Sequence, residues 1–267
     1  MGNSDLALKA HLMRRAGFGA TGGELEELAE KSYEEIVEDL LHPERVADLN
    51  EDYLRRFNPE VSYHDSHPAH AGRWIWRMIN SKKPLEEKMA LLWHQIFPTA
   101  YYKAEHTPTL IANIDTYRNN GLSNMKQILL DLAKDPSMNY WLDNCENHAD
   151  QPNENWGREL LELFSMGVGN YSEDDIKNAS RAFTGWTFEQ PLPLYPFGNY
   201  ESKFVYDDTD HDDGEKTFLG QTGRFNGEDI INIICQQPAT AKFVSRHLYN
   251  FFVEDENQVH TWNIEPP

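Results

Sequence analysis

The sequence predicts a mainly α-helical, multi-helical globular domain with a small β-containing insertion around residues 187–224. Apolar residues recur at the spacing of an amphipathic helix through most of the chain. Helix-start signals are frequent, as in the capping boxes that Thr21 forms with Glu24 and Ser32 with Glu35. Glycine, proline and aromatic residues dominate 187–224, where segments 203–206 and 216–219 favour β structure. We therefore expect roughly ten helices and very little sheet.

The helical signals divide the chain into consecutive groups within one expected domain, 1–267. We expect N-terminal helices within 4–57, central helices within 71–185, the insertion at 187–224 and C-terminal helices within 227–253. One helix is expected to span 45–57. The stretch 58–70 contains two prolines and three histidines and predicts a loop.

Composition excludes several classes of function. The formal charge is -20, with 44 acidic against 24 basic residues, which argues against binding nucleic acid or anionic membranes. No run approaches the roughly 18 apolar residues of a transmembrane helix, so we expect a soluble chain without a transmembrane segment. Two cysteines, Cys145 and Cys235, are too few for a disulfide framework, although one bridge would be compatible with the sequence.

The densest group of candidate site residues lies on a helix expected from Pro152 to Met166, with Gly167 as its left-handed stop. A polar stripe borders the apolar face of this helix. It consists of Asn155, Glu159, Glu162 and Met166. Glu159 falls between Leu163 and Met166, where a surface helix would carry an apolar residue. We therefore expect Glu159 to be buried and compensated by a partner.

Two interpretations of this stripe remain open. Glu159 and Glu162, at i and i+3, could hold a metal or form an acid/base pair, with Arg158 or Lys216 binding an anionic group. Alternatively they belong to a structural network, in which Arg158 pairs with Glu162 and Glu159 meets a cation such as Arg181. We favour the network because helical di-metal sites usually add a histidine on the same helix, and none is present.

A ligand cleft is expected between the Asn153–Glu162 helix and the His211–Lys216 turn. Asn153, Asn155 and Trp186 are candidate ligand-binding residues there, and Trp186 would form a wall. His94 is a separate candidate, as a metal or haem ligand, but one histidine without a partner at ligand spacing is more often a satisfied buried side chain.

The acidic turn 207–214 is a second candidate site. Oxygen-rich turns suit hard cations, so His211, Asp212 and Asp213 are candidate ligands of a divalent cation, the one cofactor the sequence indicates. An EF-hand loop is excluded, because Asp213 and Leu219 stand where glycine and glutamate are required.

Motifs for nucleophilic or nucleotide chemistry are absent from the sequence. It contains no G-x-S-x-G, no P-loop, no G-x-G-x-x-G and no H-E-x-x-H. It also lacks C-x-x-C-H, which excludes covalent haem attachment.

A series of motifs runs in order along nearly the whole chain. They are HLMRRAGFG (11–19), EKMALLWH (87–94), DPSM (135–138), PNENWGRELLELF (152–164), GVGNY (167–171), AFTGW (182–186) and HDDGEKTFLG (211–220). Together they resemble the bacterial family called domain of unknown function 1800. Threonine is common in that family where this chain has Ser165.

The resemblance implies an uncharacterised protein, because the family has no established catalytic residues. Many members look exported, which implies a periplasmic or envelope location, and their genes often lie beside a family that resembles sulfatases. The resemblance therefore implies a module that acts with a sulfatase-like partner in handling surface polysaccharide. The alternative is a metal-assisted or acid/base enzyme at the cleft described above. Members usually continue well past the segment matching 239–244, so we expect a fragment that lacks C-terminal helices.

Overall fold

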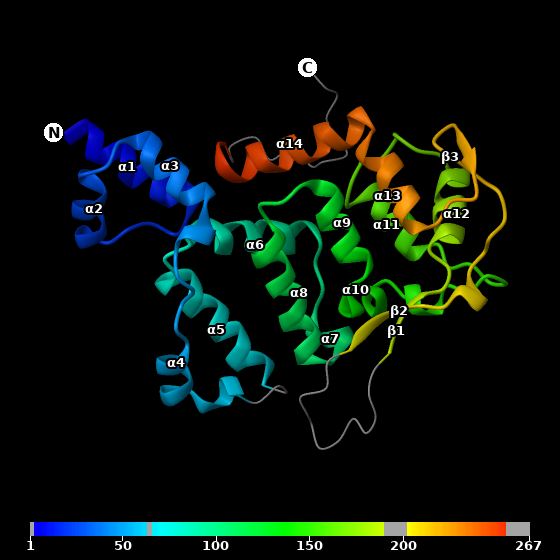
Figure 1. Cartoon of the computed structure of the whole chain (residues 1–267), viewed down its shortest axis with the longest axis horizontal. Coiled ribbons are helices and arrows are strands. Elements are labelled where there is room, and N and C mark those ends of the chain that lie inside the picture. Colours follow the sequence, from blue (N-terminus) through cyan, green and yellow to red (C-terminus); the bar gives the residue numbers. More distant parts are fainter. Residues whose placement is uncertain (1–2, 63–65, 190–201, 255–267) are drawn as a thin grey trace.

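A computed structural model describes residues 3–62, 66–189 and 202–254 (Figure 1). The mainly α-helical prediction is confirmed. Fourteen α-helices and two small two-stranded sheets make up the regular structure of these ranges. Figure 1 shows α1 to α3 at one end, α4 to α10 through the middle, and α11 to α13 with the sheets at the other end. Helix α14 crosses the top of this arrangement.

Three helices form the N-terminal part, and the second and third start where the capping signals predict. The three helices are α1 (Asn3–Ala16), α2 (Gly22–Ala29) and α3 (Tyr33–Leu41). In both predicted capping boxes the side chain of the cap residue accepts a hydrogen bond from the backbone N–H of the third helical residue. The side chain of that residue, a glutamate, accepts one from the backbone N–H of the cap residue. Local side-chain chemistry therefore sets these boundaries.

The segment that follows differs from expectation. Instead of one helix over 45–57, a 3₁₀ turn (Pro43–Arg45) precedes the short α4 (Asp52–Phe57) and a second 3₁₀ turn (Pro59–Ser62). The expected loop over 58–70 was wrong at its end, because α5 spans His67–Asn80. Pro68 lies in the first turn of α5, where its missing N–H costs no helical hydrogen bond. His67 and His70 are therefore helical.

The central helices include the largely buried α6, which packs against α5 and α8. They are α6 (Pro84–Ile96), α7 (Tyr101–Ala104), α8 (Thr107–Asn120), α9 (Met125–Ala133) and α10 (Pro136–Trp141). Leu92 of α6 and Leu129 of α9 are at most 2% exposed, and both belong to a cluster of buried apolar side chains that continues into α11 to α13. The core is thus continuous from the middle of the molecule to its sheet-bearing end.

The insertion consists of two antiparallel pairs. β1 (Trp186–Glu189) pairs with β2 (Lys203–Tyr206), and β3 (Lys216–Phe218) pairs with β4 (Gln221–Gly223). Trp186 lies opposite Tyr206, and Lys216 lies opposite Gly223. The expected β segments 203–206 and 216–219 are therefore strands, the second one residue shorter than expected. The part of the insertion over 190–201 lies outside the described residues.

The helix that carries Glu159 and Glu162 is shorter than expected. α11 spans Asn155–Glu162, so Pro152 precedes it, and tight turns follow before Gly167, which adopts φ +79° as predicted. Gly157 packs so closely on Ser180 of α12 (Glu173–Ala182) that a side chain there would clash.

Helices α13 (Gly227–Cys235) and α14 (Pro238–Phe252) complete the described chain. No membrane-spanning candidate occurs among the described helices. Both cysteines are free thiols.

Candidate functional site

Glu159 does not meet the cation that the sequence predicts. Arg181 instead binds Asp212, with Nε 2.6 Å from Oδ2. Arg158 pairs with Glu154 and Glu173 rather than with Glu162. Glu159 is half-buried rather than buried as expected, and within the described residues its carboxylate has no ion pair. Burial raises its pKa, and the neighbouring Glu162 charge adds to that effect.

Glu162 lies at the edge of a groove of about 230 Å³. Tyr171 Oη donates to Glu162 Oε2 at 2.9 Å. The groove lies between α6, the end of α11 and α14, and is lined by Gln95, Ile96, Pro98, Glu162, Leu163, Gly167, Val168, Phe243 and His247. Leu163 is 42% exposed here, although the sequence placed it on the buried face. Because α11 ends at Glu162, Leu163 leaves the helical face.

The acidic turn is organised by its own side chains. His211 Nδ1 lies 2.9 Å from the Thr184 carbonyl oxygen, and Asp212 is the partner of Arg181. Lys216 is 1% exposed, and its ammonium donates to the carbonyl oxygens of Asp212 and Gly214. A protein cation thus occupies a carbonyl-lined position inside the turn. In the described part of the chain, no group of three or more His, Cys, Asp or Glu side chains is arranged to hold a metal ion.

The remaining candidate ligands serve mainly local structure. Trp186 is 2% exposed, and its ring meets those of Phe183 and Phe204 edge-on. Asn153 Oδ1 accepts from the Asn155 backbone N–H at 3.0 Å, which fixes the approach to α11. Asn155 Nδ2 lies 3.3 Å from an Asp143 carboxylate oxygen. Trp186 is therefore a core residue rather than a cleft wall.

α12 contacts both halves of the cleft expected from the sequence. Its Ser180 packs on Gly157 of α11, and the adjacent Arg181 holds Asp212 of the turn. No hydrogen bond or ion pair joins the side chains of 153–162 to those of 211–216 within the described chain. The two candidate regions thus have separate partners.

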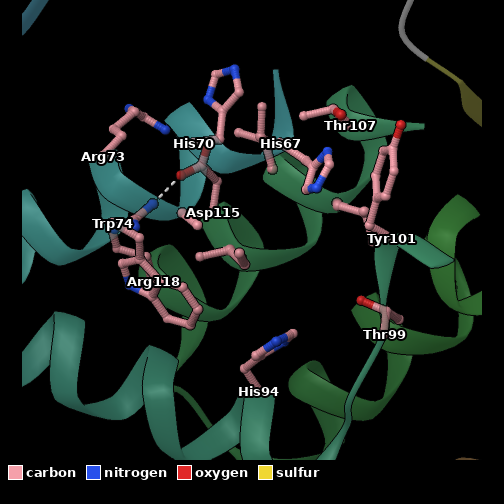
Figure 2. A pocket seen from close by; sticks show the side chains of 14 residues that line it. His67, His70, Arg73, Trp74, His94, Thr99, Tyr101, Thr107, Asp115 and Arg118 are labelled. Atoms are coloured by element: carbon pink, nitrogen blue, oxygen red, sulfur yellow. Dashed lines mark hydrogen bonds and ion pairs between the residues drawn. The ribbon is translucent and has the colours of Figure 1, made fainter. Parts of the chain in front are cut away.

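His94, by contrast, lies in a larger pocket, of about 260 Å³, between α5, α6 and α8 (Figure 2). Its apolar side is formed by Ala71, Trp74, Leu110, Ile111 and Ile114. Its polar side chains are His67, His70, Arg73, His94, Thr99, Tyr101, Thr107, Asp115 and Arg118. Figure 2 shows the His94 ring directed from α6 toward the space between Trp74 and Tyr101. Apolar walls with a few directed polar groups are typical of small-molecule sites.

The His94 imidazole is free to serve a ligand. Its Nδ1 is buried without a hydrogen-bond partner among the described residues. Its ring lies edge-on to Trp74, with centroids 5.5 Å apart. Burial lowers the pKa of His94, so the ring is neutral at pH 7 and offers one donor and one acceptor.

The pocket wall opposite Trp74 is an aromatic stack. His67 lies flat on Tyr101, with ring centroids 3.9 Å apart and planes 16° from parallel. Thr107 is 3% exposed, and its hydroxyl has no hydrogen-bond partner in the described chain. The pocket therefore offers aromatic surface and polar atoms that no neighbouring side chain satisfies.

A buried ionic network supports this pocket from behind. Glu87 of α6 is 1% exposed and accepts hydrogen bonds from Trp74, Arg77 and Arg118. Glu51 accepts two from Arg73, at 2.8 and 2.9 Å, and binds Arg77. Burial raises the pKa of Glu51, but the hydrogen bonds from Arg73 and Arg77 outweigh it and lower that pKa overall. The network fixes α5 against α6 and α8.

Sequence reasoning found only His94 among these pocket residues. The available signal was the spacing of His67, His70 and Trp74 on one face of a helix, once Pro68 is accepted as a first-turn proline. The assignment of 58–70 to a loop concealed it. The contribution of α8 could not be inferred, because it depends on how the helices pack.

Comparison with known families gives one finding. The family described as "Protein of unknown function (DUF1800)" matches residues 11–263. Comparison with curated proteins and with solved structures gives no match.

Proposed function

Since the chain belongs to the DUF1800 family, whose description assigns no activity, its function has to come from its own chemistry, and we propose that it is a binding module for surface polysaccharide. One sugar-sized ring of the polymer would enter the pocket between α5, α6 and α8. The module would be exported or envelope-associated and would act with a sulfatase-like partner protein.

The pocket's size and lining support this proposal. At about 260 Å³ it is smaller than the roughly 300–1,000 Å³ of sites for drug-sized ligands, so it suits a single ring. The face of Trp74 and the His67–Tyr101 stack offer apolar contact to the C–H face of a sugar. His94 and Thr107 offer hydrogen bonds to ring hydroxyls.

The observation that carries the proposal is the His94 ring, buried in a pocket wall without a hydrogen bond from the described chain. Leaving a buried polar group unpaired costs stability, and this cost is recovered when a ligand supplies the bond. Solid-phase retention of the protein on immobilised polysaccharides tests the proposal. We expect wild type to be retained and His94→Phe to be lost from the column.

His247→Phe is the matched control, because His247 is also half-buried, has a pKa lowered by burial, and lies outside this pocket. Equal retention of both variants would contradict the proposal. The partner is tested separately, by co-purification with the product of the neighbouring sulfatase-like gene. Failure to co-purify would remove the partner and leave polysaccharide binding intact.

A second candidate is an acid/base or metal-assisted enzyme, favoured by the unpaired, burial-raised carboxyl of Glu159 beside Glu162. In it Glu159 and Glu162 would exchange protons with a ligand in the groove toward His247, with Arg158 or Lys216 as anion-binding groups. His211, Asp212 and Asp213 would hold a divalent cation. Elemental analysis of purified protein tests the cation. Turnover that survives Glu159→Gln would refute the acid/base role.

A further inference from the structure

We infer that the pocket between α5, α6 and α8 accepts an uncharged ring and rejects the same ring carrying a carboxylate or sulfate. This inference rests on the proposed function, because it names the class of sugar that the same pocket takes. It also separates this protein's ligand from the sulfated sugars that its proposed partner would act on.

The arginines at the pocket look like anion-binding groups, but the charge of each is already paired with a protein carboxylate. Arg118 Nε and Nη2 donate to the two Glu87 oxygens at 2.8 and 3.1 Å, and its Nη1 binds Asp115 (Figure 2). The Arg118 side chain is only 7% exposed. The Nε–Nη2 edge of Arg118 therefore faces the Glu87 carboxylate, and its Nη1 faces the Asp115 carboxylate.

Arg73 is held by Glu51 along one edge, while its Nη1 has no partner among the described residues. Its Nε and Nη2 donate to the two Glu51 oxygens at 2.8 and 2.9 Å. Glu51 in turn also binds Arg77, which reaches Glu87 through Nε. The two guanidinium groups that line the pocket are thus held by carboxylates behind its wall.

The charges of this network cancel. Three guanidinium groups (Arg73, Arg77, Arg118) face three carboxylates (Glu51, Glu87, Asp115), so +3 and -3 give zero. Arg55 also lies 3.9 Å from Glu51, but its side chain is 58% exposed and water screens its charge. The neutral His94 ring adds no charge at pH 7.

Among the described residues, an anionic ring therefore meets no guanidinium whose charge is not already balanced by a carboxylate. It would either remain unpaired beside Leu110, Ile111 and Ile114 or draw Arg118 away from Glu87, which is 1% exposed. Both outcomes leave a charge desolvated without compensation. We expect the anionic form of a ring to bind at least about a hundredfold more weakly than its neutral form.

The experiment uses neutral and anionic rings of matched shape on the full chain, followed by ligand-observed NMR at pH 7. The pairs are N-acetylglucosamine with its 6-sulfate, glucose with glucuronate, and benzamide with benzoate. We expect the neutral member of each pair to bind and the anionic member to fail. His94→Phe should weaken this binding about tenfold, which assigns it to this pocket.

A gain of binding tests the charge balance directly. Asp115→Asn removes one carboxylate, frees Arg118 Nη1 and leaves the network at +1, and the Asp115 side chain is 40% exposed and tolerates the change. We expect this variant to bind glucuronate or benzoate at least about tenfold more tightly than wild type. Asp39→Asn is the control, because it changes the net charge equally at an exposed ion pair with Lys31.

The outcomes separate the inference from the function on which it rests. If the anionic member of a pair binds wild type as tightly as the neutral member, or more tightly, the inference is wrong. The proposal that the pocket binds a sugar is then unaffected. Benzamide binding without any sugar binding supports the inference and removes the polysaccharide function. No binding by any neutral ring, or equal gains in Asp115→Asn and Asp39→Asn, overturns the inference.

Discussion

The Glu87 carboxylate on α6 binds the Arg118 guanidinium on α8 through two hydrogen bonds, of 2.8 and 3.1 Å, with Glu87 only 1% exposed. Trp74 and Arg77 of α5 donate to the same carboxylate. One side chain of α6 therefore holds the two helices that form the walls of the pocket.

Glu87→Ala should lower the free energy of unfolding by about 3–5 kcal/mol, because Arg77 and Arg118 each lose one of two carboxylate partners and the buried network is left with an uncompensated positive charge. Glu86→Gln, at the neighbouring half-buried position, is the control and should cost less than about 1 kcal/mol. Urea denaturation measures both. A loss below about 1 kcal/mol for Glu87→Ala would show that the network does not hold the pocket.

Glu159→Gln should leave stability at pH 7 unchanged or slightly higher. Burial raises the folded-state pKa of Glu159, so folding favours the protonated carboxyl and is more favourable at low pH. This advantage is lost as pH rises through that pKa. The difference between variant and wild type should therefore disappear below about pH 4. Glu162→Gln weakens the Tyr171 hydrogen bond and should cost about 0.5–1.5 kcal/mol. Marked destabilisation by Glu159→Gln would reveal a structural partner.

Lys216→Met should destabilise the turn 207–214, because two backbone carbonyl oxygens lose the ammonium that they bind. We expect a loss of about 1–3 kcal/mol in thermal unfolding. Lys203→Met on exposed β2 is the control, with a change within about 0.5 kcal/mol. If calcium raises the melting temperature of wild type but not of Asp212→Asn, the turn holds a cation in addition to Lys216.

The His148–Asp210 pair predicts a pH window of stability. The hydrogen bond from His148 Nδ1 to the Asp210 carboxylate raises the pKa of His148 and lowers the pKa of Asp210. Because the pKa of His148 is raised, the pair stabilises the fold below about pH 6.5. This stabilisation is lost as pH rises through the folded-state pKa of His148. Because the pKa of Asp210 is lowered, its ionised form stabilises the fold above about pH 4. This stabilisation is lost as pH falls through the folded-state pKa of Asp210.

His148→Gln should remove this pH dependence, at a cost of at most about 1 kcal/mol near pH 5–6, because the pair is partly exposed. Unfolding at pH 5.5 and pH 8.5 measures the effect. A difference between wild type and variant that is equal at both values would contradict the linkage.

Local sequence signals predicted the fold well where a few neighbouring residues decide it. Thr21 with Glu24 and Ser32 with Glu35 cap their helices as expected, because capping needs only residues three apart. Pro68 was misleading, since a proline both ends one helix and begins another. α11 stops earlier than its apolar pattern predicts, so the face assigned to Leu163 was wrong.

The site could be predicted only in part. His94 was identified as a candidate, but its pocket joins α5, α6 and α8, and helix periodicity does not say which helices pack together. The partner of Arg181 was missed for the same reason: Asp212 lies 31 residues away in a turn. Glu159 was expected to have a cationic partner, but within the described chain it forms no ion pair, and the Arg158 charge only partly offsets the effect of burial on its pKa.

The most direct test of the central claim is binding of N-acetylglucosamine to wild type, His94→Phe and His247→Phe, with unfolding measured in parallel. His94 makes no hydrogen bond within the described chain, so His94→Phe should keep wild-type stability. It should bind about tenfold more weakly, because the ligand loses a hydrogen bond in an apolar pocket. His247→Phe should bind as wild type does. Equal binding by all three proteins, or no binding by wild type, would contradict the account.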